Sequence, residues 1–124
     1  MANTRIPVSF IATDAPEAAL SFYTSILGLK LKEATPFALV LNDGAHVLHV
    51  QIVPEVEPAS YTVHGWQVDN IANEIAALAS KGVQFQRFNQ LDQDALGIWT
   101  TPDGNKIAWF KDPSDNTLSL TETG

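Results

Sequence analysis

The sequence predicts an α+β fold made of two similar modules, each in the order strand, helix, strand, strand, strand. Apolar residues recur at helical spacing in two segments, and short strand-like runs follow each of them. The pattern also repeats: Asp14 to Gly28 corresponds to Asp69 to Gly82, with offsets of 55 (69 − 14) and 54 (82 − 28) residues. A module of this kind leaves one sheet face bare. We therefore expect the two modules to form a curved mixed sheet around a central cleft.

The first module begins with a short apolar strand from Ile6 to Ala12. Asp14 is expected to cap the following helix, which Pro16 helps to start and which covers Glu17 to Leu27. Gly28 then supplies the stop, because glycine readily adopts the left-handed conformation that ends many helices. Three further strands are expected at Leu29–Glu33, Phe37–Leu41 and His46–Val53.

A proline-bounded, acidic connector at residues 54–59 separates the two modules. The second module is predicted to start with a strand at Tyr61–Val68, then Asp69 as cap, a helix at Ile71–Ser80 and Gly82 as its stop. The remaining strands are expected at Val83–Phe88, Gly97–Thr101, Lys106–Phe110 and Asn116–Thr121. The length predicts one domain of residues 1–124, with the modules at about 5–53 and about 60–122.

The charge balance narrows the classes of partner. Fourteen acidic against seven basic side chains give a net charge of −7, which repels nucleic acids and anionic membranes and suits a cationic ligand. The chain has no cysteine, which excludes disulfides and thiolate chemistry and fits a reducing compartment. No basic-then-apolar signal follows Met1, and no apolar run reaches membrane-spanning length. We expect a soluble, cytoplasmic protein.

Two motifs resemble a known family. Ser21-Phe22-Tyr23 followed by Ile26-Leu27-Gly28-Leu29 looks like the "FY…LG" helix of the vicinal oxygen chelate superfamily, which includes glyoxalase I, extradiol dioxygenases and bleomycin-resistance proteins. Phe110 to Asn116 is similar to the "DPDGN" turn before the last strand of that family. With the duplicated modules, the resemblance covers nearly the whole chain and implies a glyoxalase/bleomycin-resistance-like fold.

The resemblance also implies where a metal would bind. In metal-dependent members, four ligands come from the first and fourth strands of each module. The corresponding positions here are Val8 (or Pro7), His49, Val63 and Ser119. Only His49 carries a good ligand for a divalent cation. His64 could replace Val63 only if the strand slipped by one residue, which turns its side chain to the other sheet face. We therefore predict no metal and no cofactor.

Strand alternation selects the candidate ligand-binding side chains. His49 and Gln51 lie on the strand face opposite Leu48 and Val50. The full candidate set is His49, Gln51, Gln67, Ser119, Trp99 and Trp109. His49 could bind a polar ligand atom or act as a general base, and the alternative is a hydrogen-bonded structural histidine. The two tryptophans could stack on a flat or cationic ligand, and the alternative is core packing.

Gly65 lies on a predicted strand, where its missing side chain would leave room for a ligand or mark a bulge. His46 is expected to be solvated, and His64 to be packed under the helix.

The leading hypothesis is a metal-free protein that binds a small molecule in its cleft, similar to antibiotic-binding resistance proteins. The resemblance also implies a homodimer. The alternative is an enzyme, either a metal-dependent lyase or dioxygenase with unusual ligands or a metal-independent isomerase with His49 as its base. A third hypothesis is a partner-binding domain whose cleft is filled. The sequence leaves the ligand unidentified, because the fold places a ligand and the loop side chains select it.

Overall fold

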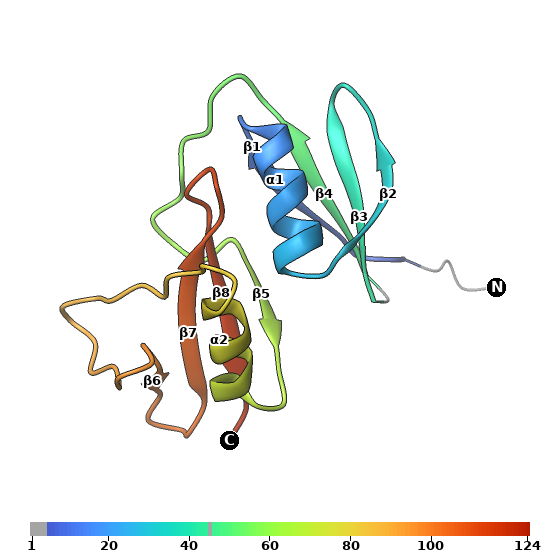
Figure 1. Cartoon of the computed structure of the whole chain (residues 1–124). Coiled ribbons are helices and arrows are strands. Elements are labelled where there is room, and N and C mark those ends of the chain that lie inside the picture. The colour runs from blue at the N-terminus through green and yellow to red at the C-terminus, as the bar shows by residue number, and fades with distance from the viewer. Residues whose placement is uncertain (1–4, 45) are drawn as a thin grey trace. The chain divides into compact units, whose positions relative to one another are not determined.

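In the computed structural model, which describes residues 5–44 and 46–124, each half of the chain forms its own four-stranded mixed sheet with a helical segment (Figure 1). The first unit is Met1–Glu57 and the second is Pro58–Gly124. No helix in the described part of the chain is long and apolar enough to cross a membrane.

The sheet of the first unit contains all four predicted strands. Its strands are β1 (Val8–Thr13), β2 (Lys30–Ala34), β3 (Ala38–Asp43) and β4 (His46–Ile52), in the order β1-β4-β3-β2. β1 runs parallel to β4, and the other neighbours are antiparallel. The strand ends differ from the predicted ones by two residues at most, because period-two alternation is a strong signal in these runs.

The helix of the first unit changes type halfway. α1 (Pro16–Ser21) is followed by a π-helical segment, η1 (Phe22–Ile26), which the sequence did not predict. Gly28, with φ of 80°, ends the helix as expected. The expected cap is wrong, because the N-cap residue is Ala15 and makes no side-chain capping bond. Asp14 instead accepts a hydrogen bond at Oδ2 from the backbone N–H of Val56, 3.3 Å away, so a contact with the connector replaces the local cap.

The core of the first unit follows the predicted alternation. Leu48 and Val50 are 1% and 0% exposed, and they are buried together with Ile11, Ala19, Phe22, Tyr23, Leu39 and Leu41. Since neighbouring residues of a strand point to opposite faces, His49 and Gln51 lie on the other face of β4.

The second unit repeats the topology of the first. Its elements are β5 (His64–Gln67), α2 (Ile71–Ala79), β6 (Trp99–Thr100), β7 (Lys106–Lys111) and β8 (Thr117–Glu122). The strand order is β5-β8-β7-β6, with β5 parallel to β8 and the other neighbours antiparallel. This is the order and direction pattern of the first sheet, so the predicted α+β class and the predicted duplication are confirmed.

One predicted strand of the second unit is wrong. Residues Val83–Phe88 form no strand and make only an isolated bridge between Phe85 and Phe110. The side-chain amide of Gln93 takes the hydrogen bonds that a neighbouring strand would otherwise make there. It donates to the carbonyl of Gln86 at 2.9 Å and accepts from the backbone N–H of Phe88 at 2.7 Å.

The start of α2 also differs from the expectation. The N-cap is Asn70 and not Asp69, and its side-chain oxygen accepts a hydrogen bond from the backbone N–H of Asn73 at 3.0 Å. The helix ends near Gly82, as predicted, and this glycine has a φ of 94°.

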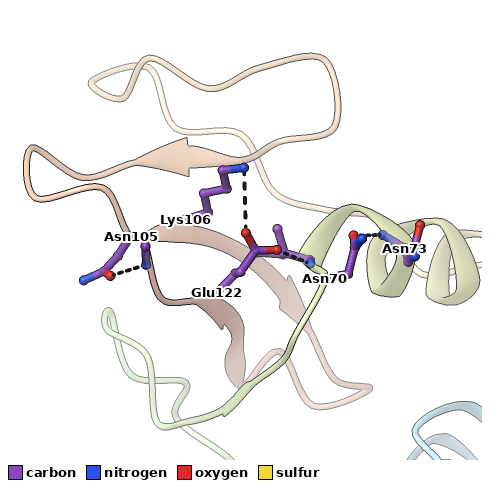
Figure 2. A network of polar contacts seen from close by, with 7 residues as sticks. Asn70, Asn73, Asn105, Lys106 and Glu122 are labelled. Atoms are coloured by element: carbon purple, nitrogen blue, oxygen red, sulfur yellow. Dashed lines mark hydrogen bonds and ion pairs between the residues drawn. The ribbon is translucent and has the colours of Figure 1, made fainter.

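Glu122 at the end of β8 ties the last strand to the start of α2. Its Oε1 accepts a hydrogen bond from the backbone N–H of Ile71 at 2.9 Å, and its Oε2 lies 3.8 Å from Nζ of Lys106 (Figure 2). A carboxylate at a helix N-terminus is favourable because the unpaired N–H groups carry partial positive charge.

α2 covers one face of the second sheet. Its buried residues are Ile71, Ile75 and Leu78, and the buried strand residues are Ala108, Phe110, Leu118 and Leu120. The alternate residues point the other way, and we call this side the face opposite α2. It carries Gly65, Gln67, Ile107, Trp109, Lys111, Thr117, Ser119 and Thr121, with Trp99 paired beside Ile107.

Candidate functional site

A pocket of about 310 Å³ lies entirely within the second unit, where β7 ends and β8 begins. Its lining residues are Ala59, Ser60, Tyr61, Thr62, Phe88, Gln90, Leu91, Trp109, Lys111 and Thr117. They come from the segment before β5, from the loop between α2 and β6, and from the two central strands. The volume lies at the lower end of the range typical of small-molecule sites.

Trp109 on β7 is the central aromatic residue of this pocket. Its indole Nε1 donates a hydrogen bond to Oγ1 of Thr62 at 3.0 Å. The ring of Phe88 meets it edge-on, with centroids 5.3 Å apart and planes at 89°. On another side, Trp99 stacks on it at 6.3 Å and 28°. These contacts from three segments fix the orientation of the indole before any ligand arrives.

Two further aromatic side chains differ in how they are held. Phe88 is half-buried, and its backbone N–H is held by Gln93. Tyr61 is 70% exposed, so it lines the pocket without being part of the core. The pocket therefore combines aromatic side chains held by other residues, Trp109 and Phe88, with the solvent-exposed ring of Tyr61.

The pocket has one charged lining residue, Lys111. It lies two residues after Trp109 on the same strand and so on the same face. Hydroxyl groups of Ser60, Thr62 and Thr117 supply further polar atoms. The net acidity of the chain is thus not a property of this pocket.

The structure places four predicted site residues on the face opposite α2, and three of them lie side by side there. Trp109 lines the pocket, Trp99 stacks behind it, and Ser119 lies directly across from Trp109 on β8. Ser119 is 9% exposed, so its hydroxyl is nearly buried.

The side chain of Ser119 explains why residue 65 is a glycine. A Cβ at Gly65 would lie 2.3 Å from Oγ of Ser119, so the hydroxyl fills the space that the glycine leaves. The pairing of β5 with β8 is regular at this point. Gly65 thus leaves neither the expected room for a ligand nor a bulge.

Gln67, His49 and Gln51 are not among the residues that line the pocket. Gln67 is the last residue of β5 and is exposed. His49 is half-buried on β4, with its ring 4.9 Å from that of Phe10 and tilted by 54°. Its imidazole makes no hydrogen bond with another of the described residues. Gln51 is exposed two residues further along the same face.

Of the other two histidines, His46 lies at the surface as predicted, and His64 is on the predicted side of its strand but only half-buried. His64 shares the α2 side of its strand with Trp66, and the two rings lie 4.8 Å apart at 85°. β5 has therefore not slipped, and His64 does not replace Val63.

The residues do not fit a divalent metal ion. Among residues 5–44 and 46–124, no three His, Cys, Asp or Glu side chains lie close enough to share one. At the four positions implied by the family resemblance, Val8 and Val63 carry no donor atom, and Ser119 offers only a neutral hydroxyl beside Gly65.

Of the ten lining residues, only Trp109 was among the predicted site residues, and three of the others show why residues were missed. Lys111 lies one residue beyond the predicted strand Lys106–Phe110, and one more residue in that strand would have placed it on the face of Trp109. Tyr61 was assigned to a strand that begins only at His64. Phe88 is positioned by Gln93, and no sequence pattern signals a side-chain amide that bridges two segments.

The fold agrees with comparisons to known proteins. The model of the family described as "Glyoxalase/Bleomycin resistance protein/Dioxygenase superfamily" matches residues 5–120. We found no significant match among curated protein sequences.

Several solved structures share the fold. The antibiotic binding protein TnmS3 from Streptomyces sp. CB03234 is 21% identical with a TM-score of 0.74, over 100% of this chain and 99% of that one. Lactoylglutathione lyase from Agrobacterium tumefaciens is 15% identical with a TM-score of 0.74, over 98% and 95%. A superfamily member from Sphaerobacter thermophilus DSM 20745 is 19% identical with a TM-score of 0.73, over 97% and 98%. At these identities the likeness shows the fold alone.

Proposed function

The chain belongs to the glyoxalase/bleomycin resistance protein/dioxygenase superfamily, and from this premise we propose that it binds a small planar molecule in the pocket of its second unit without a metal ion.

The aromatic lining of the pocket carries this proposal. Trp109, Phe88 and Tyr61 all contribute to a volume of about 310 Å³. Aromatic faces favour offset or edge-on contact with flat rings, and a wall already held in place loses little entropy on binding. One protein of the same fold is described as an antibiotic binding protein, which agrees with this proposal.

The donor atoms of the chain support the metal-free part of the proposal. Of the four positions implied by the family resemblance, only His49 has a strong ligand atom for a divalent cation, and one imidazole alone binds such ions weakly. Homodimerisation, a cytoplasmic location, and ligand contacts by His49, Gln51, Gln67 and Ser119 stay predictions.

A ligand screen with matched variants tests the proposal. A panel of planar aromatic compounds is titrated while tryptophan fluorescence and the melting temperature are followed. A compound that binds the folded state raises the melting temperature by mass action. Tyr61→Ala should weaken the affinity for such a compound about threefold to tenfold, as the loss of one aromatic contact would. Because Tyr61 is 70% exposed, its removal should leave the fold intact.

Phe37→Ala is the matched control, since Phe37 is 78% exposed and is not a lining residue of the pocket. The affinity should be unchanged in Phe37→Ala and after dialysis against EDTA. The proposal fails if Tyr61→Ala leaves every affinity unchanged, or if EDTA abolishes binding and a divalent ion restores it.

A further inference from the structure

Lys111 is the last residue of β7, and its position in the pocket bears on the charge of the ligand. It shares the strand face of Trp109 and lies across from Thr117 at the start of β8. It forms no ion pair with any residue of the described ranges 5–44 and 46–124. Lys106 at the other end of the same strand does pair, with Glu122. Of the two lysines of β7, only Lys106 thus has a counter-charge in the part of the chain that the structure describes.

The carboxylate nearest in sequence to Lys111 is bound within its own turn. Oδ1 of Asp112 accepts hydrogen bonds from the backbone N–H groups of Ser114 and Asn116, both at 2.9 Å. Oδ2 accepts one from the side chain of Asn116 at 2.9 Å. Asp112 is 5% exposed, so its side chain is held inside the turn and the charge of Lys111 stays available to the pocket.

The local charge of the pocket is therefore opposite to that of the whole chain. The chain carries a net charge of −7. At physiological salt, the electrostatic effect of exposed charges is largely screened beyond about 8 Å, so charges elsewhere on the surface have little effect inside the pocket. Inside the pocket, the aromatic and hydroxyl lining is neutral, and the ammonium group of Lys111 is the only full charge. A flat ring could lie against Trp109 while an acidic substituent reaches Lys111.

We propose that the pocket selects planar aromatic molecules that carry an anionic group, with Lys111 as the counter-charge. This inference rests on the proposed function, because it needs the pocket to bind a planar molecule at all. It reverses the cationic preference that the net charge predicts.

Three fluorescent or absorbing probes separate charge from shape. 8-Anilinonaphthalene-1-sulfonate is anionic, N-phenyl-1-naphthylamine has the same ring skeleton without the sulfonate, and 9-aminoacridine is a planar cation. We expect the sulfonate to bind about fivefold more tightly than the neutral probe, as one partly solvated charge pair would give. Lys111→Gln should remove this preference, because it should weaken the binding of the sulfonate much more than that of the neutral probe.

Lys106→Gln is the control, because it changes the net charge equally on the same strand but on the other face. It should keep the preference for the sulfonate. Tyr61→Ala, which should weaken both naphthalene probes, assigns the binding to this pocket. Melting curves of each variant confirm that it is folded.

The outcomes distinguish the two proposals. If both naphthalene probes bind equally, Lys111→Gln changes neither and Tyr61→Ala weakens both, the anionic preference is wrong and the proposed function stands. If 9-aminoacridine binds most tightly and Lys111→Gln strengthens it, the preference is for cations and our inference is overturned. If Tyr61→Ala changes none of the affinities, the proposed function itself fails.

Discussion

The indole Nε1 of Trp109 donates a hydrogen bond to Oγ1 of Thr62 at 3.0 Å, between residues 47 positions apart. Trp109 belongs to β7 and Thr62 precedes β5, and β8 lies between these two strands in the sheet. The bond therefore reaches across β8 and joins two lining residues of the pocket, Trp109 and Thr62.

Thr62→Val keeps the shape of this side chain and removes the acceptor. We expect the indole N–H of Trp109 to exchange with solvent several-fold faster, and the free energy of unfolding to fall by about 0.5–1 kcal/mol. Amide and indole hydrogen exchange by NMR measures the first effect. Thr117→Val is the control, since Thr117 lines the same pocket without bonding to the indole. Equal exchange rates in both variants would contradict the role of Thr62.

Gln93→Met should loosen the loop that carries Phe88. The amide of Gln93 makes hydrogen bonds with the backbone of Gln86, Phe88 and Gly97, at 2.9, 2.7 and 2.8 Å. Losing three such bonds should reduce the free energy of unfolding by about 2 kcal/mol. Urea denaturation measures the loss. Gln84→Met, at an exposed position nearby, should have almost no effect, and an equal loss in both variants would argue against the bridging role.

Gly65→Ala should destabilise the pairing of β5 with β8. The new methyl group would lie 2.3 Å from Oγ and 3.0 Å from the backbone oxygen of Ser119. We expect a loss of about 1–3 kcal/mol, as overpacking usually gives. Ser119→Ala in the same chain removes the closest atom and should recover part of it. A double-mutant cycle measured by thermal unfolding checks this coupling, and strict additivity would show that the two residues do not compete for the space.

Glu122→Gln should weaken the start of α2. The amide oxygen can still accept from the N–H of Ile71, but the negative charge at the helix N-terminus and opposite Lys106 is lost. We expect a loss of about 0.5–1 kcal/mol at low salt that shrinks as salt is added. Glu33→Gln, an exposed position on β2, makes the same charge change and should be nearly neutral. A loss independent of salt would mean that the hydrogen bond, and not the charge, matters.

The sequence predicted strand positions and helix ends correctly where they depend on a short local pattern of residues. The alternation along β4 and β8 predicted which apolar residues pack into the core, and Gly28 and Gly82 ended their helices in the left-handed conformation. The N-caps were wrong in both units. Asp14 contacts the connector through Val56, and Asn70 caps α2 in place of the adjacent Asp69. At the start of α2, Asp69 and Asn70 are both residue types that cap helices well, so the local sequence does not determine which of them is the N-cap.

The sequence by itself determined the duplicated α+β modules and the sheet face of most strand residues, because these depend on backbone periods of two and 3.6 residues. Only the tertiary structure decided which side chains meet in the pocket. Trp109 and Thr62 are joined across β8, and Phe88 is placed by Gln93 instead of by a strand. Such contacts join segments with no shared local pattern, so they exist only once the sheet and its loop have formed.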